Sequence, residues 1–212
     1  MGQKVNPKSY RLLLNRDWDS RWFAAHPKTY EKQLWEDIRI RELVDKITGP
    51  QAAVAKVMIE RTLDKTKIIL VSGRPGVIIG RSGQGIEKIT EMVKKIIPGK
   101  VNVEVIEVRK PELSAALVAQ NIGQQISRRI AYRRAVKMAI QKVMQAGALG
   151  IKVSTAGRLN GAEIARSEKF TEGSLPLSVL KSQIDFAVYH ARTTYGTIGI
   201  KVWIYLKPET AE

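Results

Sequence analysis

The most constraining feature of the chain is a pair of glycines, Gly80 and Gly83, separated by two residues. The pair lies between an apolar run and the start of an amphipathic segment. Because glycine has no β-carbon, another backbone can approach such a turn closely, and the exposed N–H groups of a following helix start suit a phosphate. The sequence therefore predicts a loop that contacts a sugar-phosphate backbone, formed by Gly80, Arg81, Ser82 and Gly83.

The spacing of these glycines does not fit a nucleotide-binding loop. A P-loop requires G-x-x-x-x-G-K-[ST], whereas only three residues separate Gly76 from Gly80, and Arg81-Ser82 follow. A dinucleotide-binding fingerprint, G-x-G-x-x-G, has its glycines in the opposite order. The pattern I-G-x-x-G-x-x-I, which ends at Ile86, instead resembles the KH domain, whose G-x-x-G clamps single-stranded nucleic acid. A glycine-rich turn without a ligand is the alternative for the loop taken alone.

The charge balance favours a polyanionic partner. The chain has 36 Lys and Arg against 20 Asp and Glu, a net charge of +16 with a pI near 10.1. Such an excess repels itself in the folded state unless a polyanion neutralises it. Acidic membranes also attract basic surfaces, but no apolar run is long enough to span a bilayer and no secretion signal is apparent. We therefore expect a cytoplasmic protein with no membrane partner.

The composition offers little for catalysis. Zero cysteines exclude disulfides, thiol nucleophiles and cysteine-based zinc sites. The only histidines, His26 and His190, have no base or ligand partner at a recognisable spacing. We therefore expect no catalytic residue, no metal and no cofactor, so the protein is not expected to be an enzyme.

The first half of the chain has the periodicity of a small α+β domain. A helix is predicted from Pro27 to the stop at Gly49-Pro50, then strands at 54–61 and 67–71, joined by a turn at Leu63-Asp64-Lys65. A short helical turn, the G-x-x-G loop, a helix at 84–97 and a strand at 101–105 follow. The order helix-strand-strand-helix-helix-strand matches the type II KH fold.

The second half predicts two helices on a mainly antiparallel sheet. The helices start near Glu112 and Arg129, the second ending near Ala146, and strands are expected around 151–153, 162–170, 185–193 and 197–206. The fold class is thus α+β, with a basic extended arm at 1–15, a type II KH domain at 16–108 and an α+β domain at 109–212. We expect no homo-oligomer.

A long basic block occupies this second half. No acidic residue occurs from Leu113 through Ala162, a one-signed run that ordinary soluble helices do not have. On a helical wheel Arg134, Lys137 and Gln141 share a face, while Val136, Ile140 and Val143 take another. A solvated basic face is the alternative, but contact with phosphates is favoured because each such contact releases counterions. For the segment Gly157 to Arg166, which contains Arg158 and Glu163, a charge-paired structural loop and an RNA contact remain equally open.

Several long segments resemble the bacterial small-subunit ribosomal protein S-three family. The matching motifs are Gly2-Gln3-Lys4-Val5-Asn6-Pro7, Arg74-Pro75-Gly76-Val77-Ile78-Ile79-Gly80, Val108-Arg109-Lys110-Pro111-Glu112-Leu113, the Gly157 to Arg166 segment, and Thr193 to Trp203. The resemblance covers nearly the whole chain, in the right order. In the loop, many members carry a lysine where this chain has Arg81 or Ser82.

The resemblance implies partners and roles. Family members sit in the head of the small ribosomal subunit, bind the 3′ major domain of 16S rRNA, and neighbour proteins S-ten and S-fourteen. They also line the channel through which mRNA enters, near proteins S-four and S-five, where an R-R-x-x-K pattern helps unwind mRNA. That pattern falls here on Arg133, Arg134 and Lys137, preceded by Arg128-Arg129. Weaker RNA contacts are expected at Lys4, Lys8, Arg11, Lys142, Arg158 and Arg166.

The physical reading and the resemblance together predict a non-catalytic RNA clamp that aids passive mRNA unwinding. Two other classes compete with this hypothesis. A free-standing KH regulator would bind transcripts away from ribosomes and is not expected to carry the second half. A KH-bearing GTPase would require the P-loop that this sequence does not have.

Overall fold

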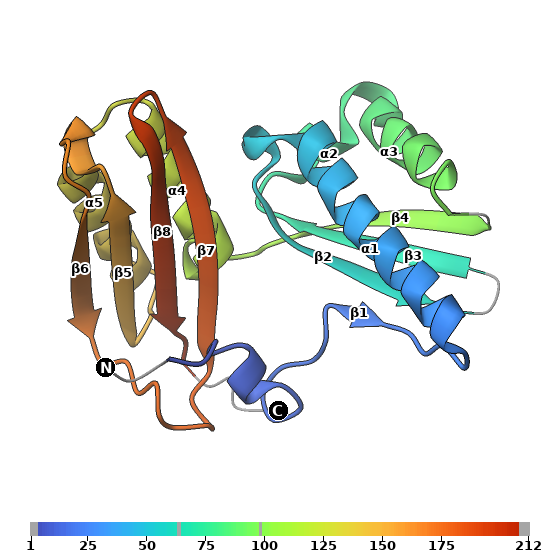
Figure 1. The fold of residues 1–212 in the computed structure, drawn as a ribbon, viewed down its shortest axis with the longest axis horizontal. Helices are drawn as coiled ribbons and strands as arrows, with labels where there is room; N and C mark the ends of the chain where they lie inside the picture. The colour runs from blue at the N-terminus through green and yellow to red at the C-terminus, as the bar shows by residue number, and fades with distance from the viewer. Residues whose placement is uncertain (1–3, 63–64, 98, 208–212) are drawn as a thin grey trace. The chain divides into compact units, whose positions relative to one another are not determined.

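The computed structural model describes residues 4–62, 65–97 and 99–207, and the chain divides into two compact units. One unit is Trp18–Arg109 and the other combines Met1–Asp17 with Lys110–Glu212. Figure 1 shows the helices and strands of each unit. The N-terminal segment therefore belongs with the second half of the chain, although the first half follows it directly.

In its described residues, the unit Trp18–Arg109 has three α-helices and a four-stranded sheet of order β1-β2-β3-β4. β2 and β3 are antiparallel, whereas β1 is parallel to β2 and β4 is parallel to β3. The elements are β1 Ser20–Arg21, α1 Pro27–Thr48, η2 Pro50–Ala52, β2 Val54–Arg61, β3 Lys65–Ser72, α2 Pro75–Ile79, η3 Arg81–Gly83, α3 Gln84–Lys94 and β4 Lys100–Glu107.

The core of this unit forms because each helix places apolar residues four apart on one face. Ile40 and Val44 of α1, with Ile89 and Val93 of α3, are fully or almost fully buried against the sheet. The order helix-strand-strand-helix-helix-strand from α1 to β4 is the predicted one. The predicted turn at Leu63-Asp64 lies outside the described residues.

The other unit is a four-stranded antiparallel sheet of order β6-β5-β8-β7. Buried side chains of α4 and α5 form one core with the sheet, so both helices cover the same face. The elements are η1 Ser9–Arg11, η4 Pro111–Leu113, α4 Ala115–Ser127, α5 Tyr132–Gln145, β5 Gly150–Gly157, η5 Leu159–Gly161, β6 Arg166–Gly173, β7 Ile184–Thr193 and β8 Gly196–Tyr205. The predicted α+β class, with two helices on a mainly antiparallel sheet, is confirmed.

Strand alternation decides which residues enter this core. On β8, Ile200 and Val202 are fully buried under the helices, while Lys201 and Trp203 lie on the face that the helices leave uncovered. β7 and β8 pair up to Thr193 and Gly196, so a tight turn joins them in the gap between the two predicted strands.

Three elements begin at least three residues later than predicted, while α3 ends at Lys94 rather than near 97 and β5 runs on to Gly157 rather than ending near 153. α4 begins at Ala115 rather than near Glu112, where the Asp185 carboxylate accepts the Ala115 backbone N–H at 2.8 Å. β6 begins at Arg166 rather than at 162, because the 3-10 turn Leu159–Gly161 comes first. α5 begins at Tyr132 rather than near Arg129, because Arg129 has a left-handed backbone conformation. Among the described residues, no helix is long and apolar enough to cross a membrane.

Candidate nucleic-acid interface

The predicted G-x-x-G loop connects α2 to α3. Gly80 ends α2 with φ +70° and Gly83 precedes α3 with φ +84°, both in the left-handed region that side chains disfavour. Glycine is therefore needed at both positions to make the turn, in addition to leaving room for a ligand. A third glycine, Gly85, was missed as a loop residue: a β-carbon there would lie 2.1 Å from the Ile78 carbonyl oxygen.

The loop presents groups that suit a phosphate. α3 starts without a side-chain cap, and although the N–H of Gln84 donates to the Arg81 carbonyl, the helix dipole favours an anion at this end. Arg81 is exposed, and its side chain has no ion pair or hydrogen bond within the described part of the chain. The loop therefore combines a free cation with a helix N-terminus.

The turn between α4 and α5 contains Arg128 and Arg129, both exposed. The N–H of Arg129 donates to the Ile126 carbonyl at 2.9 Å, and the N–H of Ile130 donates to the Gln125 carbonyl at 3.1 Å. This is a Schellman motif with Arg129 at φ +64°, where glycine is usual. α4 thus ends in a left-handed residue, which explains why α5 cannot begin there.

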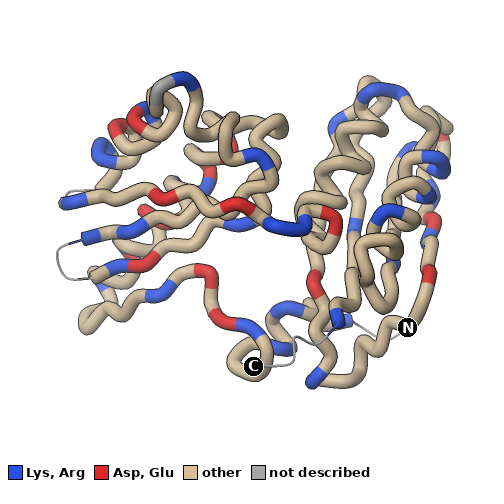
Figure 2. The backbone as a smooth tube through the Cα atoms, turned by 180° about the vertical axis from the view of Figure 1, so that it is seen from behind, with Lys and Arg blue, Asp and Glu red and all other residues tan. Residues whose placement is uncertain are grey.

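The basic face of α5 is defined here as Arg133, Arg134, Lys137 and Lys142. All four are exposed, while Val136, Ile140 and Val143 are buried on another side of the helix, with Arg133 at the border between the two. α5 has Lys and Arg but no Asp or Glu, and Figure 2 shows the Lys and Arg positions of this unit in blue. Within the described residues, the side chains of Arg134, Lys137 and Lys142 form no ion pair or hydrogen bond, nor do those of Arg128 and Arg129.

Arg133 differs from its neighbours because it is paired within the protein. Its Nη2 donates to Glu168 Oε1 at 2.9 Å and its Nε to Glu168 Oε2 at 3.3 Å. The buried Tyr132 hydroxyl donates to the same carboxylate at 2.8 Å. Hydrogen bonds from Arg133 and then Tyr132 lower the pKa of Glu168, and the bond to Glu168 raises the pKa of Arg133.

The two arginines of the 157–166 segment are held by different groups. Arg158 Nε donates to the Ala162 carbonyl at 2.9 Å and Nη1 to the Tyr195 carbonyl at 3.2 Å, with the guanidinium 5.7 Å from the Tyr195 ring. These contacts join η5 to the β7–β8 turn, which favours the structural interpretation of Arg158. Arg166 lies 3.7 Å from Glu168 and is half exposed.

Among the N-terminal residues predicted to contact RNA, Arg11 is buried, so the predicted RNA contact of Arg11 is corrected. Arg11 is 1% exposed, and its guanidinium donates to the carbonyls of Pro7, Leu177, Val179 and Ser182. With every nitrogen used inside the unit, Arg11 anchors the N-terminal segment to the β6–β7 loop and has no surface for RNA. Part of the predicted extended arm is in fact the 3-10 helix Ser9–Arg11.

The two N-terminal lysines keep accessible surface. Lys8 lies 3.8 Å from Asp185 and its side chain is 39% exposed. Lys4 is exposed and lies near Lys152, whose pKa is lowered by burial and then by the charges of Lys4 and Lys169. Lys152 is also 5.7 Å from the Trp203 ring, on the uncovered sheet face. Positive charge therefore gathers on that face as well.

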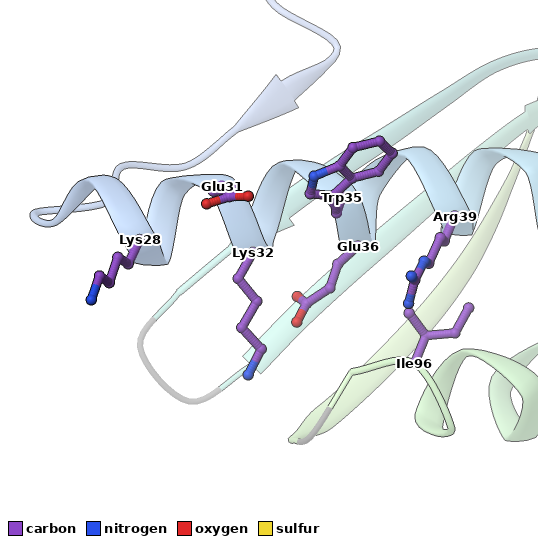
Figure 3. Close-up of a pocket in the computed structure, with 7 residues that line it drawn as sticks. All are labelled: Lys28, Glu31, Lys32, Trp35, Glu36, Arg39 and Ile96. Atoms are coloured by element: carbon purple, nitrogen blue, oxygen red, sulfur yellow. The ribbon is translucent and has the colours of Figure 1, made fainter.

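One pocket, with a volume of about 490 Å³, lies on α1 and involves none of the predicted site residues. Figure 3 shows its lining: Lys28, Glu31, Lys32, Trp35, Glu36, Arg39 and Ile96. Its carboxylate Glu36 is already paired with Arg61 at 2.6 Å. Among the described residues, no cluster of His, Asp and Glu is placed to hold a metal ion.

Known protein families match both halves of the chain. Residues 39–113 match the KH domain family model, and residues 122–204 match the model described as ribosomal protein S3, C-terminal domain. The small ribosomal subunit protein uS3 of Parvibaculum lavamentivorans is 51% identical over 205 residues, which is 97% of this chain and 86% of that protein. The chain belongs to the uS3 family.

Other uS3 proteins match equally well. The uS3 of Beijerinckia indica is 51% identical and that of a Bradyrhizobium species 50% identical, each over 97% of this chain. The resemblance drawn from the motifs is thereby confirmed, and so is the KH domain in the first half. The uS3 family consists of ribosomal proteins rather than enzymes, in agreement with the expectation that this chain is not an enzyme.

Proposed function

We propose that this chain is a structural RNA-binding protein in the head of the small ribosomal subunit, in the cytoplasm. It binds the 3′ major domain of 16S rRNA beside proteins S-ten and S-fourteen, and lines the channel where mRNA enters, near S-four and S-five. The basic face of α5 grips the mRNA backbone and aids its passive unwinding. Membership in the uS3 family and the exposed, unpaired cations of α5 support this function.

The observation that supports this function most directly is that Arg134 and Lys137 are exposed and form no ion pair or hydrogen bond among the described residues. A cationic side chain on a helix is stabilised by a carboxylate three or four residues away, but these two have no acidic neighbour on α4 or α5. They therefore have their full charge available for phosphates. Phosphate contacts carry no sequence information, as a surface that must accept every message requires.

Unwinding needs no energy source within this protein. Basic side chains that bind single strands lower the free energy of the separated state, while the movement of mRNA during translation supplies the work. The G-x-x-G loop has a different role in this proposal: Gly80, Arg81, Ser82 and Gly83 hold rRNA backbone near the start of α3. The uncovered sheet face, with Phe186 and Trp203 rings 5.1 Å apart, supports contact with neighbouring proteins.

The test uses cells whose only copy carries Arg134→Ala with Lys137→Ala. We expect the variant to sediment with the small subunit, because neither residue supports the fold, and to translate through mRNA hairpins more slowly than wild type. The matched control is Lys28→Ala with Lys32→Ala, which removes two exposed charges from α1.

Two results would contradict the proposal in different ways. Normal hairpin transit by the Arg134 and Lys137 variant would remove the assignment of α5 to mRNA. In sucrose-gradient sedimentation of a cell lysate, wild-type protein found only in the light fractions at both low and high salt would favour the free-standing KH regulator instead.

A further inference from the structure

Among the described residues, Glu168 is the acidic residue that contacts the basic face of α5, through Arg133. It lies on β6, and its register partner on β5 is the buried Thr155, so its side chain is on the helix-covered side of the sheet. There it receives hydrogen bonds from Arg133 and Tyr132 and lies 3.7 Å from Arg166. One carboxylate therefore engages two of the arginines predicted to contact RNA.

The carboxylate is held more firmly than the arginine. Tyr132 is 2% exposed and is the first residue of α5, so its hydroxyl fixes Glu168 against the helix start. The Arg133 side chain is 62% exposed. An ion pair with one partner in solvent contributes little to stability and is easily exchanged. An RNA phosphate offers Arg133 the same bidentate, charge-assisted bonds.

The pairing also changes the charge that RNA meets. Glu168 occupies the Nε and Nη2 edge of the guanidinium, and its negative charge cancels one of the two arginine charges beside it. While the pair is closed, Arg133 adds no net charge to the basic face. Arg134 and Lys137 are not affected, because neither contacts an acidic group among the described residues.

We propose that Glu168 is a positioning residue that holds Arg133 in an internal pair and competes with RNA phosphate for it. The proposal rests on the proposed function, because it takes the α5 basic face as the RNA-binding surface. Its consequence is that Arg133 and Arg134, although adjacent in sequence, contribute differently: Arg134 binds phosphate at once, whereas Arg133 must first leave Glu168.

The test measures the binding of single-stranded oligouridine RNA to the full-length protein as a function of salt. Glu168→Gln keeps the shape of the side chain and an acceptor for Tyr132 but removes the competing charge. One additional phosphate contact steepens the slope of log K against log salt by about 0.7. Across a fourfold change in salt, affinity for the variant should then fall about 2.6-fold more than for wild type.

Glu172→Gln is the matched control. Glu172 lies on the same strand and the same face, four residues or about 13 Å away, and is exposed. It removes the same charge without touching Arg133, so its slope should stay close to that of wild type. Glu168→Asp, which restores the charge, should return the slope toward wild type, whereas a loss of fold alone would not be rescued in this way.

The outcomes separate the two proposals. If Arg134→Ala with Lys137→Ala leaves the affinity unchanged, the proposed RNA surface itself is wrong. If that variant weakens binding but Glu168→Gln leaves the slope unchanged, or weakens binding, the competition between Glu168 and phosphate is overturned. Equal steepening by Glu168→Gln and Glu172→Gln would reduce the effect to general charge and would also overturn it.

Discussion

At the scale of single residues, burial and partners decide what each arginine does. Arg11 is enclosed by backbone carbonyls, and Arg61 is enclosed by carboxylates on α1. Arg133 is exposed but paired, and Arg134 is exposed without a partner in the described chain. The net charge of the sequence counts these side chains equally, but only exposed ones can meet a phosphate.

Arg61 gives the sharpest prediction at this scale. Its side chain is 8% exposed and bonds Glu36 and Asp37, which are 9% and 5% exposed. Arg61→Ala leaves two buried carboxylates without their cation, so the free energy of unfolding should fall by about 3 to 5 kcal/mol. Urea denaturation checks this, with Lys67→Ala as the control, since Lys67 pairs with Glu104 at the surface. Equal losses in the two variants would refute the importance of burial.

At the scale of elements, periodicity predicted nearly all the helices and strands, because each buries one face. What could not be predicted depends on contacts between distant segments. The start of α4 is set by Asp185, seventy residues away, and the end of α4 by the left-handed conformation of Arg129. Likewise, the sequence identified the charges of the basic face but not that Arg133 is paired with Glu168, since strand register decides that contact.

Close approach between two elements supports a second stability prediction. Gly123 of α4 packs against Tyr189 of β7, and a β-carbon there would lie 2.3 Å from the tyrosine ring. Gly123→Ala should lower the free energy of unfolding by about 1 to 2 kcal/mol, because overpacking exceeds the gain in helix propensity. Differential scanning calorimetry checks this. Gly76→Ala in α2, where nothing lies within 4 Å of the added β-carbon, is the control and should not lower the free energy of unfolding. A free energy of unfolding equal to wild type in Gly123→Ala would contradict the prediction, because it would mean that the Tyr189 side chain moves away without cost.

At the scale of the whole molecule, a net charge of +16 is distributed over two units with separate cores. Each unit carries exposed cations that we propose contact RNA: Arg81 beside the start of α3 in one, and Arg134 and Lys137 on the basic face of α5 in the other. This division fits a protein that docks on folded rRNA with one surface and meets a moving strand with another. The sequence predicted both surfaces, because charge and glycine spacing are visible without a structure.

The central claim, that the basic face of α5 meets mRNA, is tested most directly by tethered cleavage. Because the chain has no cysteine, Gln141→Cys on the exposed side of α5 provides a unique attachment point for an iron chelate that leaves all cations in place. In assembled small subunits carrying mRNA, we predict cleavage of the mRNA downstream of the decoding site from Cys at position 141. Weaker or no cleavage is expected from Thr171→Cys on the uncovered sheet face. Cleavage of rRNA alone from position 141, with the mRNA intact, would contradict the claim.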